Sequence, residues 1–446
     1  MKAKTIKRIS LISIITIVTL VLSLVAVAFL TTAQPQAQAA VDKLYTSEYK
    51  GDNGTLDGQH YDRNTIAAKY GVDTSDVFTI TSGAELYDFF NGKYIQKVGF
   101  LDCDVAIAYN ATREGYDTIS NVSSSAAIFD DIFDGNGYTV KIYGGAGESN
   151  STQTITDNDR PNRIEQIGRY DSIDVWYEYT GFLVAQNYGT IANFTIDYTS
   201  PHSAIVAING SSQTADGSLG MNISDRLLSQ SEGVFSAGIV AGLNGYNGVI
   251  DNVKINVDNA FTVIKRAGKS GKYNENAAYV GAIAGRAEEN SKINNCWVDM
   301  PTINTGVYAG TQGKSGNSTQ TDRHVLAVAG GLVGNMDIGT AQLTYCALTG
   351  NGTVKGFGNR AGGDGKFKVY AGGAVGGSIK IAGETSVADC YNNDDLLIKD
   401  GQIKGIISSW VGSRFSNMDK VARESFGSLF GAVGTDDSIK SISMLY

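Results

Sequence analysis

Apolar and polar residues alternate over short stretches of the chain, and glycine, asparagine and aspartate separate these stretches. A period of two is typical of strands with one buried face, whereas the 3.6-residue period of amphipathic helices is nearly absent. The short stretches are rich in β-branched residues and are bounded by residues that favour turns. The pattern therefore predicts an all-β fold.

A short block recurs six times, with a small or glycine-rich step, two or three apolar residues and a closing glycine or alanine. The recurrence of small residues at one position predicts a tight bend that leaves no room for a Cβ atom. The closing residues are Ala185, Ala241, Gly285, Gly334, Gly376 and Gly431.

A second block of apolar positions follows each first block. Its last two positions are two residues apart, as in a strand, and the step of three before them predicts a bend between two short strands. An asparagine precedes the middle position in three consecutive repeats, at Asn193, Asn252 and Asn295, and stacked amides can form hydrogen bonds along a stack. The instances are Ile191/Phe194/Ile196, Ile250/Val253/Ile255, Ile293/Cys296/Val298, Leu343/Cys346/Leu348, Val387/Cys390 and Ile439/Ile442/Met444.

Repeats of this length indicate a solenoid, a propeller or an array. The short strands, the turn residues between them and the recurring small residues favour a solenoid, because the closing signature of a propeller blade is missing. Stacked parallel coils rise by ~4.8 Å each, and neighbouring coils cover one another's open faces. Six repeats would then form one continuous core.

The N-terminal part predicts a cap for this stack. Residues 82–90 have the pattern of a short amphipathic helix, with Ser82 as its N-cap, Glu85 three residues later, and an apolar face that could cover the first coil. Residues 134–137, Asp-Gly-Asn-Gly, predict a turn in which Gly135 and Gly137 take positive φ.

The repeats G-G-L-V-G-N and I-x-N-C resemble the GLUG motif of bacterial surface β-helix proteins, and the element F-D-G-N-G-Y-T-V-K-I resembles the opening of such proteins. The resemblance covers residues 82–446 and implies a right-handed parallel β-helix on an exported protein. Many members are adhesins or carry separate enzyme domains. The chain departs from the motif at Ala185 and Ala241, where glycine is common, and its sixth repeat lacks the N-C pair.

The first forty residues have the pattern of a signal peptide. Basic residues precede an uncharged run over residues 9–30, and small residues at 37–40 form a cleavage site. The alternative is an uncleaved membrane anchor, because a run of this length can cross a bilayer. No later run has membrane length. We therefore expect a signal peptide at 1–40, a lead-in segment at 41–81, a β-helix with six GLUG-like repeats at 82–446, and an extracellular or cell-surface location.

Composition narrows the candidate chemistry. The net charge is −9 and no basic patch stands out, which argues against nucleic acid as a partner. Three histidines and cysteines without C-x-x-C spacing leave little for a zinc site, and no cofactor is expected. Calcium on Asp52, Asn53 and Asp57 is an alternative to simple turn residues, although the EF-hand spacing is absent.

Three cysteines share one position of the second block. A stack of parallel coils would place them in an inward ladder of small apolar side chains, although a disulfide remains an alternative. These cysteines are Cys296, Cys346 and Cys390.

Long polar insertions separate the repeats, over 144–175, 201–236, 258–279, 301–327 and 351–369. Insertions in a solenoid commonly emerge on one face, which often binds a partner. Aromatic side chains in or beside them suit sugar rings, and the alternative is that they pack the insertions down. The candidates are Tyr170, Trp176, Tyr177, Tyr179, Tyr273 and Tyr308.

The sequence favours a non-catalytic protein that contacts glycans or a host or cell-surface protein. Pairs of aspartates at 130–131, 394–395 and 436–437 do not by themselves form an acid/base pair, because neighbours on a strand point to opposite faces. No nucleophile elbow or Cys/His pair is evident. A polysaccharide lyase or glycoside hydrolase, and a structural subunit of a surface assembly, are the alternatives, and the oligomeric state stays open.

Overall fold

The computed structural model of the protein consists mostly of β-strands in parallel sheets with few helices. The expected signal peptide lies outside the described residues. No helix in the described part of the chain is both long and apolar enough to cross a membrane. The described residues are 60–109, 112–119, 128–144, 162–170, 173–199, 205–206, 221–222, 226–229, 233–266, 276–302, 305–312, 324–336, 341–344, 346–350, 352–359, 366–378, 397–403, 408–413, 421–427, 430–433 and 442–445.

The predicted capping helix is confirmed as α4 (Gly83–Phe90). The Ser82 hydroxyl accepts a hydrogen bond from the Glu85 N–H at 3.2 Å, which satisfies one of the free donors at the start of the helix. Leu86, Phe89 and Phe90 are buried and pack against the first coil of the core. The helix therefore covers the apolar end of the stack, as its sequence predicts.

The segment before residue 82 belongs to the fold. It forms α3 (Arg63–Tyr70), the 3-10 turn η1 (Thr74–Asp76) and β1 (Val77–Ile80), and β1 pairs with β2 (Val98–Leu101). Helix α3 ends at Gly71, which has φ of 66°. Apolar side chains of α3 pack on outward-facing residues of β1 and β2. The sheet structure thus begins at Val77, ahead of the expected boundary.

Four sheets of neighbouring strands make up the main body, and we name them sheets A to D. Sheet A contains β1, β2, β3 (Val105–Tyr109), β4 (Asp117–Ile119), β6 (Ile132–Asp134), β7 (Thr139–Tyr143), β11 (Thr190–Thr199), β17 (Val249–Val257), β21 (Lys292–Asn294), β22 (Trp297–Met300), β26 (Gln342–Thr344), β27 (Ala347–Gly350), β31 (Leu397–Ile403) and β35 (Ile442–Leu445). Sheet B contains β5 (Ile128–Phe129), β10 (Val184–Asn187), β16 (Ala241–Asn244), β20 (Ala284–Ala287), β25 (Val333–Met336), β30 (Val375–Ser378) and β34 (Phe430–Val433).

Sheets C and D complete the set. Sheet C contains β14 (Arg226–Ser229), β18 (Ala260–Arg266), β23 (Gly306–Gln312), β28 (Thr353–Asn359) and β32 (Ser408–Ser413). Sheet D contains β8 (Asn162–Tyr170), β9 (Ile173–Gly181), β15 (Gly233–Gly238), β19 (Asn276–Gly281), β24 (His324–Gly330), β29 (Lys366–Gly372) and β33 (Val421–Gly427). A separate antiparallel pair consists of β12 (Ile205–Val206) and β13 (Met221–Asn222).

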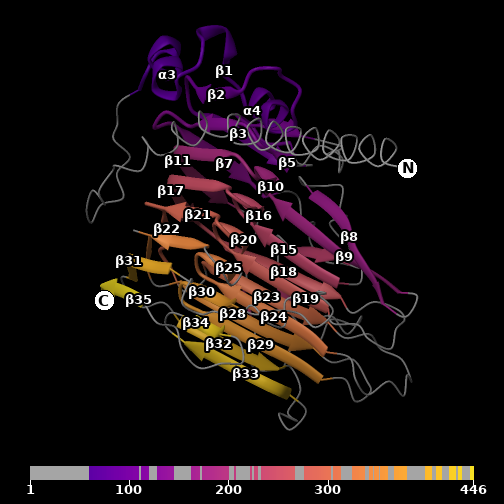
Figure 1. Cartoon of the computed structure of the whole chain (residues 1–446). Coiled ribbons are helices and arrows are strands. Elements are labelled where there is room, and N and C mark those ends of the chain that lie inside the picture. The colour runs from indigo at the N-terminus through magenta and orange to yellow at the C-terminus, as the bar shows by residue number, and fades with distance from the viewer. Residues whose placement is uncertain are drawn as a thin grey trace, which may run out of the picture.

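Successive repeats visit the sheets in the same order. The strands β15, β16, β17 and β18 lie in sheets D, B, A and C, and the next repeat returns to sheet D with β19. Equivalent strands of neighbouring repeats pair in parallel, apart from the antiparallel pair of β8 and β9. Figure 1 shows the result, a stack whose colour runs from indigo at the capped end to yellow at the other.

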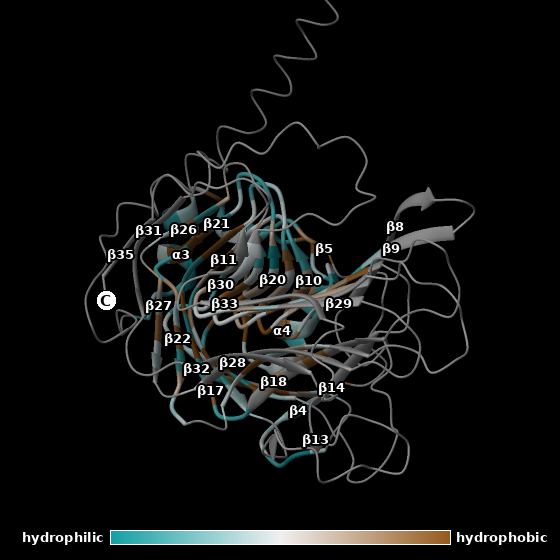
Figure 2. Cartoon of the chain, turned by 90° about the horizontal axis from the view of Figure 1, so that it is seen from below, coloured by the Kyte–Doolittle hydropathy of each residue, from teal (hydrophilic) through white to brown (hydrophobic). Residues whose placement is uncertain are grey.

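Sheet D lies inside the curl that the other sheets form. Seen along the stack, β29 and β33 lie between the strands of sheet B and those of sheet C, while sheet A curves around one side (Figure 2). Where their burial is described, the residues of β9, β15, β19, β24 and β29 are buried on both faces. Each repeat therefore has two side-chain layers, one between sheets B and D and another enclosed by sheets A, C and D.

The prediction that residues between the repeats form long surface insertions is wrong in part. Part of each insertion folds as strands of sheets C and D, including β18 and β19 within or next to 258–279 and β23 and β24 within or next to 301–327. A strand that is buried on both faces shows no alternation of apolar and polar residues. The alanine-, glycine- and tyrosine-rich strands of sheet D therefore lack the pattern by which the sequence predicts strands.

The glycines of the first block are explained by two close approaches of the backbone. A Cβ atom on Gly181, Gly238, Gly281 or Gly330, at the end of a sheet D strand, would collide with the carbonyl oxygen three residues later. A Cβ atom on Gly242, Gly285, Gly334 or Gly376 would collide with the backbone of sheet D. The tight bend is therefore as predicted, but the closing residue of the second repeat is Gly242 and not Ala241, because Ala241 pairs with Val184 and Ala284.

The bend within sheet A also has the predicted place. Asn193, Asn252 and Asn295 have φ of 63°, 53° and 50°, in the left-handed region that asparagine tolerates better than other side chains. This one residue shifts the alternation, so that Ile191 and Phe194, three residues apart, both enter the core. The first-coil turn differs from the prediction, because Asn136 and Gly137 have positive φ there and Gly135 does not.

The final coils depart from the predicted repeat. Leu343 pairs with Ile398 of β31, and Ile398 pairs in turn with Ile442 of β35. The place in sheet A that the sequence assigns to Val387 and Cys390 therefore belongs to β31, and Cys390 lies outside the described residues. Ile442 takes the first position of its triplet and not the middle one. Gly431 lies in β34, between residues that pair with β30.

The two kinds of repeat position predict opposite responses to substitution. We expect Gly334→Ala to lower the free energy of unfolding by ~3 kcal/mol or more, because the added Cβ would meet backbone atoms of Tyr279 and Val280 that cannot move aside. Cys346→Val keeps a buried apolar side chain of similar size and should cost less than ~1.5 kcal/mol. Urea unfolding followed by circular dichroism tests both, and equal losses would contradict the assigned corner.

Candidate functional site

A regular polar surface lies on the outer face of sheet A, beyond the left-handed asparagines. From that point inward and outward residues alternate, and strands β7, β11, β17, β22 and β27 pair in register. We call the outward residues of these strands the polar track. Its first row contains Lys141, Asp197, Asn256, Asp299 and Thr349, and its second row contains Thr139, Thr195, Lys254 and Trp297.

Trp297 is an aromatic residue in the second row of the polar track. Its indole Nε1–H donates a hydrogen bond to Thr349 Oγ1 at 2.9 Å, and the Thr349 hydroxyl donates to Asp299 Oδ1 at 2.6 Å. Trp297 and Asp299 remain partly exposed, whereas Thr349 is buried. The relay fixes the orientation of the indole, so that the ring is held in place while part of it faces solvent.

Asn256 and Asp197 of the first row are also linked by a hydrogen bond between their side chains. Asn256 Nδ2 donates to Asp197 Oδ1 at 2.7 Å, between neighbouring strands. Lys141 is exposed next to Asp197, and Lys254 lies next to Trp297 in the second row. Donors and acceptors therefore alternate along a surface whose strands are ~4.8 Å apart.

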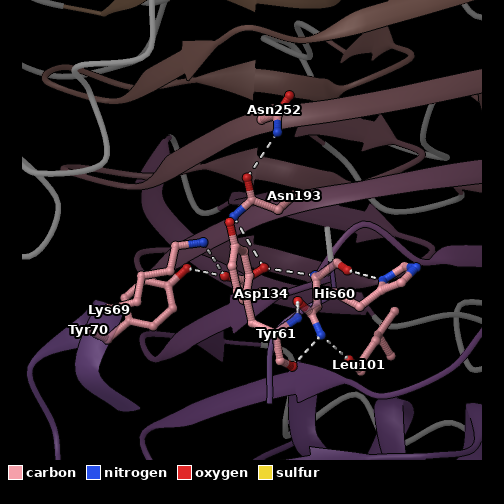
Figure 3. A network of polar contacts seen from close by, with 9 residues as sticks. His60, Tyr61, Lys69, Tyr70, Leu101, Asp134, Asn193 and Asn252 are labelled. Atoms are coloured by element: carbon pink, nitrogen blue, oxygen red, sulfur yellow. Dashed lines mark hydrogen bonds and ion pairs between the residues drawn. The ribbon is translucent and has the colours of Figure 1, made fainter. Parts of the chain in front are cut away.

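A second polar cluster connects helix α3 to the stack (Figure 3). We include α3 and α4 together in the cap. The carboxylate of Asp134 is fully buried and accepts hydrogen bonds from Lys69 Nζ at 2.6 Å, from the Tyr70 hydroxyl at 2.7 Å and from Asn193 Nδ2 at 3.2 Å. Asn252 Nδ2 donates in turn to Asn193 Oδ1 at 3.0 Å. The predicted asparagine ladder therefore exists over these two coils and ends on a carboxylate that the cap helix α3 neutralises.

Asn136 holds the segment that leads into α3. Its side chain accepts from the Tyr61 N–H at 2.8 Å and donates to the Tyr61 and Leu101 carbonyl oxygens, while its own carbonyl oxygen lies 2.8 Å from His60 Nδ1. The His60 ring stacks on Tyr138. Figure 3 shows His60, Tyr61 and Leu101 near Asp134. The buried contacts of Asp134 and Asn136 with the N-terminal segment form a structural lock between cap and stack.

The ladder changes partner at the third asparagine. Asn295 Nδ2 donates to Asp251 Oδ1 at 3.3 Å, and Asn294 Nδ2 donates to the same oxygen at 2.9 Å. Asp251 is buried, and this burial raises its pKa to about 6 although the two amides and the charge of Lys69 favour the ionised form. The hydrogen bonds and the charge of Lys69 therefore offset only part of the cost of burying the ionised Asp251 carboxylate.

A second amide ladder, at the corner between sheets B and A, escaped the sequence analysis. Asn187 Nδ2 donates to Asn244 Oδ1 at 2.8 Å and to the Val249 carbonyl oxygen at 3.1 Å, and Asn244 Nδ2 donates to the Gly248 and Lys292 carbonyl oxygens. The signal was present as an asparagine at the same distance behind the first block in two consecutive repeats. This corner is structural, because both side chains are fully buried.

Three of the six aromatic residues expected to contact a ligand are buried instead. Tyr177 and Tyr179 lie in β9 and face sheet B, with 7% and 2% of their surface exposed, and Tyr308 in β23 is 3% exposed. The Arg286 guanidinium lies 4.9 Å from the centre of the Tyr177 ring. These three residues pack the interior, because their segments are sheet strands and not surface insertions.

Two of the remaining three candidates lie in sheet D, and the third lies outside the described residues. Tyr170 and Trp176 belong to the antiparallel pair of β8 and β9, in which Tyr170 pairs with Ile173 and Trp176 pairs with Gln166. Tyr273 lies outside the described residues. Trp297 was not among the candidates from the sequence, and it lies partly exposed among the polar side chains of the track.

Cys296 and Cys346 occupy neighbouring coils of sheet A. Both are buried free thiols, and each sulfur lies near a backbone carbonyl oxygen, that of Asn294 at 3.2 Å and that of Thr344 at 3.3 Å. Burial raises the pKa of the Cys296 thiol well above its usual range, so that it stays protonated. The third described cysteine, Cys103, is also a free thiol, near the Thr81 carbonyl oxygen.

The described residues hold no group of three or more histidine, cysteine, aspartate or glutamate side chains that could bind a metal ion. Of the aspartate pairs in the sequence, only 130–131 lies in the described part of the chain. Asp131 forms an ion pair with Lys97 at 2.9 Å, and burial raises the pKa of Asp131 more than Lys97 lowers it. The residues of the possible calcium site, Asp52, Asn53 and Asp57, lie outside the described residues.

Comparison with known proteins adds no relative. No family model matches the chain, and neither a curated protein nor a solved structure matches it.

The lock between cap and stack predicts a large effect of removing one charge. Lys69→Met leaves the Asp134 carboxylate buried without its cation, and we expect a loss of ~2–3 kcal/mol in the free energy of unfolding. Lys93→Met is the matched control, because its ion pair with Asp88 is largely exposed and should contribute less than ~1 kcal/mol. Urea unfolding of both variants tests this, and equal losses would contradict the lock.

Asp251 predicts a pH dependence with a defined sign. Its folded pKa of about 6 lies above the unfolded value of ~3.9, so its contribution is fully favourable below pH ~4 and is lost as the pH rises through about 6. Asp251→Asn removes this loss, so the stability of the variant relative to the wild type should rise between pH 4 and pH 6 and then level off. Thermal unfolding across this range measures it, and a difference that does not change with pH would contradict the assignment.

Proposed function

We propose that the chain is an exported, non-catalytic protein of the right-handed parallel β-helix class, and that it contacts glycans at or near a cell surface. Three features support this proposal: the N-terminal pattern of a signal peptide, the GLUG-like repeats, and four sheets that successive repeats visit in one order. The proposal places the contact on the polar track of sheet A and not on the insertions expected from the sequence.

The observation that carries the proposal is the fixed orientation of Trp297. An indole that is ordered before binding offers an apolar face to the C–H groups of a sugar ring without losing side-chain entropy at that moment. The hydrogen bonds to Thr349 and from Thr349 to Asp299 supply that order. A partly exposed ring among hydroxyl, amide and charged groups is the combination that sugars, with apolar faces and polar rims, require.

The surroundings of the ring favour binding over bond cleavage. The two carboxylates of the track are each engaged as acceptors, Asp197 with the Asn256 amide and Asp299 with the Thr349 hydroxyl. A glycosidase of the usual kind needs one carboxyl group that donates a proton to the leaving oxygen and a second that acts as nucleophile or base. Side chains that are fixed as hydrogen-bond acceptors suit recognition of hydroxyl groups.

A glycan array tests the proposal. The secreted wild-type chain and the Trp297→Ala variant are compared on immobilised neutral, acidic and mucin-type glycans, and we expect the variant to bind at least ~10-fold more weakly, as for loss of an aromatic anchor of ~1.5–2 kcal/mol. Tyr246→Ala is the control, because Tyr246 is 51% exposed at a turn away from the track and should be neutral.

Three outcomes would count against the proposal. Equal binding by wild type and Trp297→Ala would remove the ring from the contact. No binding to any glycan by folded protein would remove the class of ligand. Release of reducing ends or unsaturated products from the same polysaccharides would replace binding by catalysis.

A further inference from the structure

The polar track is a straight line of equivalent positions. Its first row takes one residue from each of five consecutive coils, and hydrogen-bonded register fixes their order as Lys141, Asp197, Asn256, Asp299 and Thr349. At ~4.8 Å per strand the row extends for about 19 Å along the axis of the stack. The repeat distance is close to the rise per sugar in an extended glycan chain.

We infer that the polar track binds a linear, uncharged polysaccharide lengthwise, with its chain across the strands and successive sugars on successive coils. This inference rests on the proposed function and adds the shape, charge and direction of the ligand. The occupant is a segment within a long chain, not the end of a branched glycan, because the row repeats the same kind of contact from coil to coil.

The charges of the track favour an uncharged chain. Lys141 and Asp197 are register partners, and Lys254 and Trp297 lie beside Asn256 and Asp299, so that two cations and two anions alternate over the surface. A polyanion would meet Asp197 and Asp299, and a polycation would meet Lys141 and Lys254. Hydroxyl groups can donate to the carboxylates and accept from the lysines, which makes neutral sugars the complementary chemistry.

The two ends of the track also differ, because the ordered indole of Trp297 lies near one of them. Trp297 and its partner Thr349 lie toward the C-terminal coils, whereas β7 and β11 contribute polar contacts toward the cap. One sugar would stack on the indole, and each further sugar toward the cap would gain hydrogen bonds to the side chains of Asn256, Asp197 and Lys141. Affinity should therefore grow with chain length until the row is filled.

Isothermal titration with oligosaccharides of defined length tests the inference. The probes are β-1,4-linked glucose and N-acetylglucosamine oligomers of two to eight units, with oligogalacturonates as the acidic and glucosamine oligomers as the cationic comparison. We expect the hexamer of at least one neutral series to bind ~10-fold or more tightly than its dimer, a gain of ~1.4 kcal/mol, with no further gain beyond about six units.

Two variants locate the contacts. Lys141→Ala changes the end of the row farthest from Trp297, so it should weaken the hexamer several-fold and leave the dimer unchanged, whereas Trp297→Ala should weaken both. Lys292→Ala is the control, because Lys292 is an outward residue of β21 on the other side of the left-handed asparagine.

The failures are distinguishable. Binding that depends on Trp297 but is equal for dimer and hexamer, or that is restricted to the acidic or cationic oligomers, would overturn the inference and leave glycan contact standing. Binding of neither series, nor of any glycan on the array, would overturn both.

Discussion

The outer face of sheet A depends on one left-handed residue in each of several consecutive coils. In a strand of strict alternation, residues three apart point to opposite faces. The positive φ at Asn193, Asn252 and Asn295 removes this conflict, so that core residues enter from both halves of the strand. The same shift sends Asp197, Asn256 and Asp299 to the outside and sets them in register. Core packing and the polar track are therefore two results of one backbone constraint.

The amides that permit this conformation also connect the coils. Asparagine tolerates left-handed φ because its short side chain can bind locally, and here it binds the next coil instead. The chain of donors ends at Asp134, where the cap supplies a lysine and a tyrosine hydroxyl. The side chains of Asp134, Asn193 and Asn252 are thus hydrogen-bonded to neighbours on adjacent coils, as the backbone groups of paired strands are.

The repeat, the bends and the cap could be predicted from the sequence because each has a local signature. The α4 cap, the step of three in four repeats, and the small residues at the corner all follow from residue type and spacing. Sheet D could not, because strands buried on both faces carry no alternation and resemble loops in composition. For the same reason Tyr177 and Tyr179 were expected at the surface and lie inside.

The candidate site could not be predicted from the sequence, because it depends on the register in which the strands of sheet A pair. Trp297 stands alone in the sequence, next to a cysteine of the core, and its partner Thr349 is 52 residues away. Only the pairing of β22 with β27 brings these residues together. In the final coils the spacing of Val387 and Cys390 fits the repeat, but these residues do not take the predicted place in sheet A. That place belongs to β31, which pairs with β26 and β27.

The corner between sheets D and B bears on how such a chain can change in evolution. Each corner fits the backbone of its neighbours at glycine positions that admit no side chain, whereas the connection from sheet C to sheet D differs in length from one repeat to the next. A duplication or deletion of one whole repeat preserves every corner, and a shift by a single residue breaks all of them. Lineages should therefore vary in steps of one coil, which lengthens or shortens the outer face without rebuilding it.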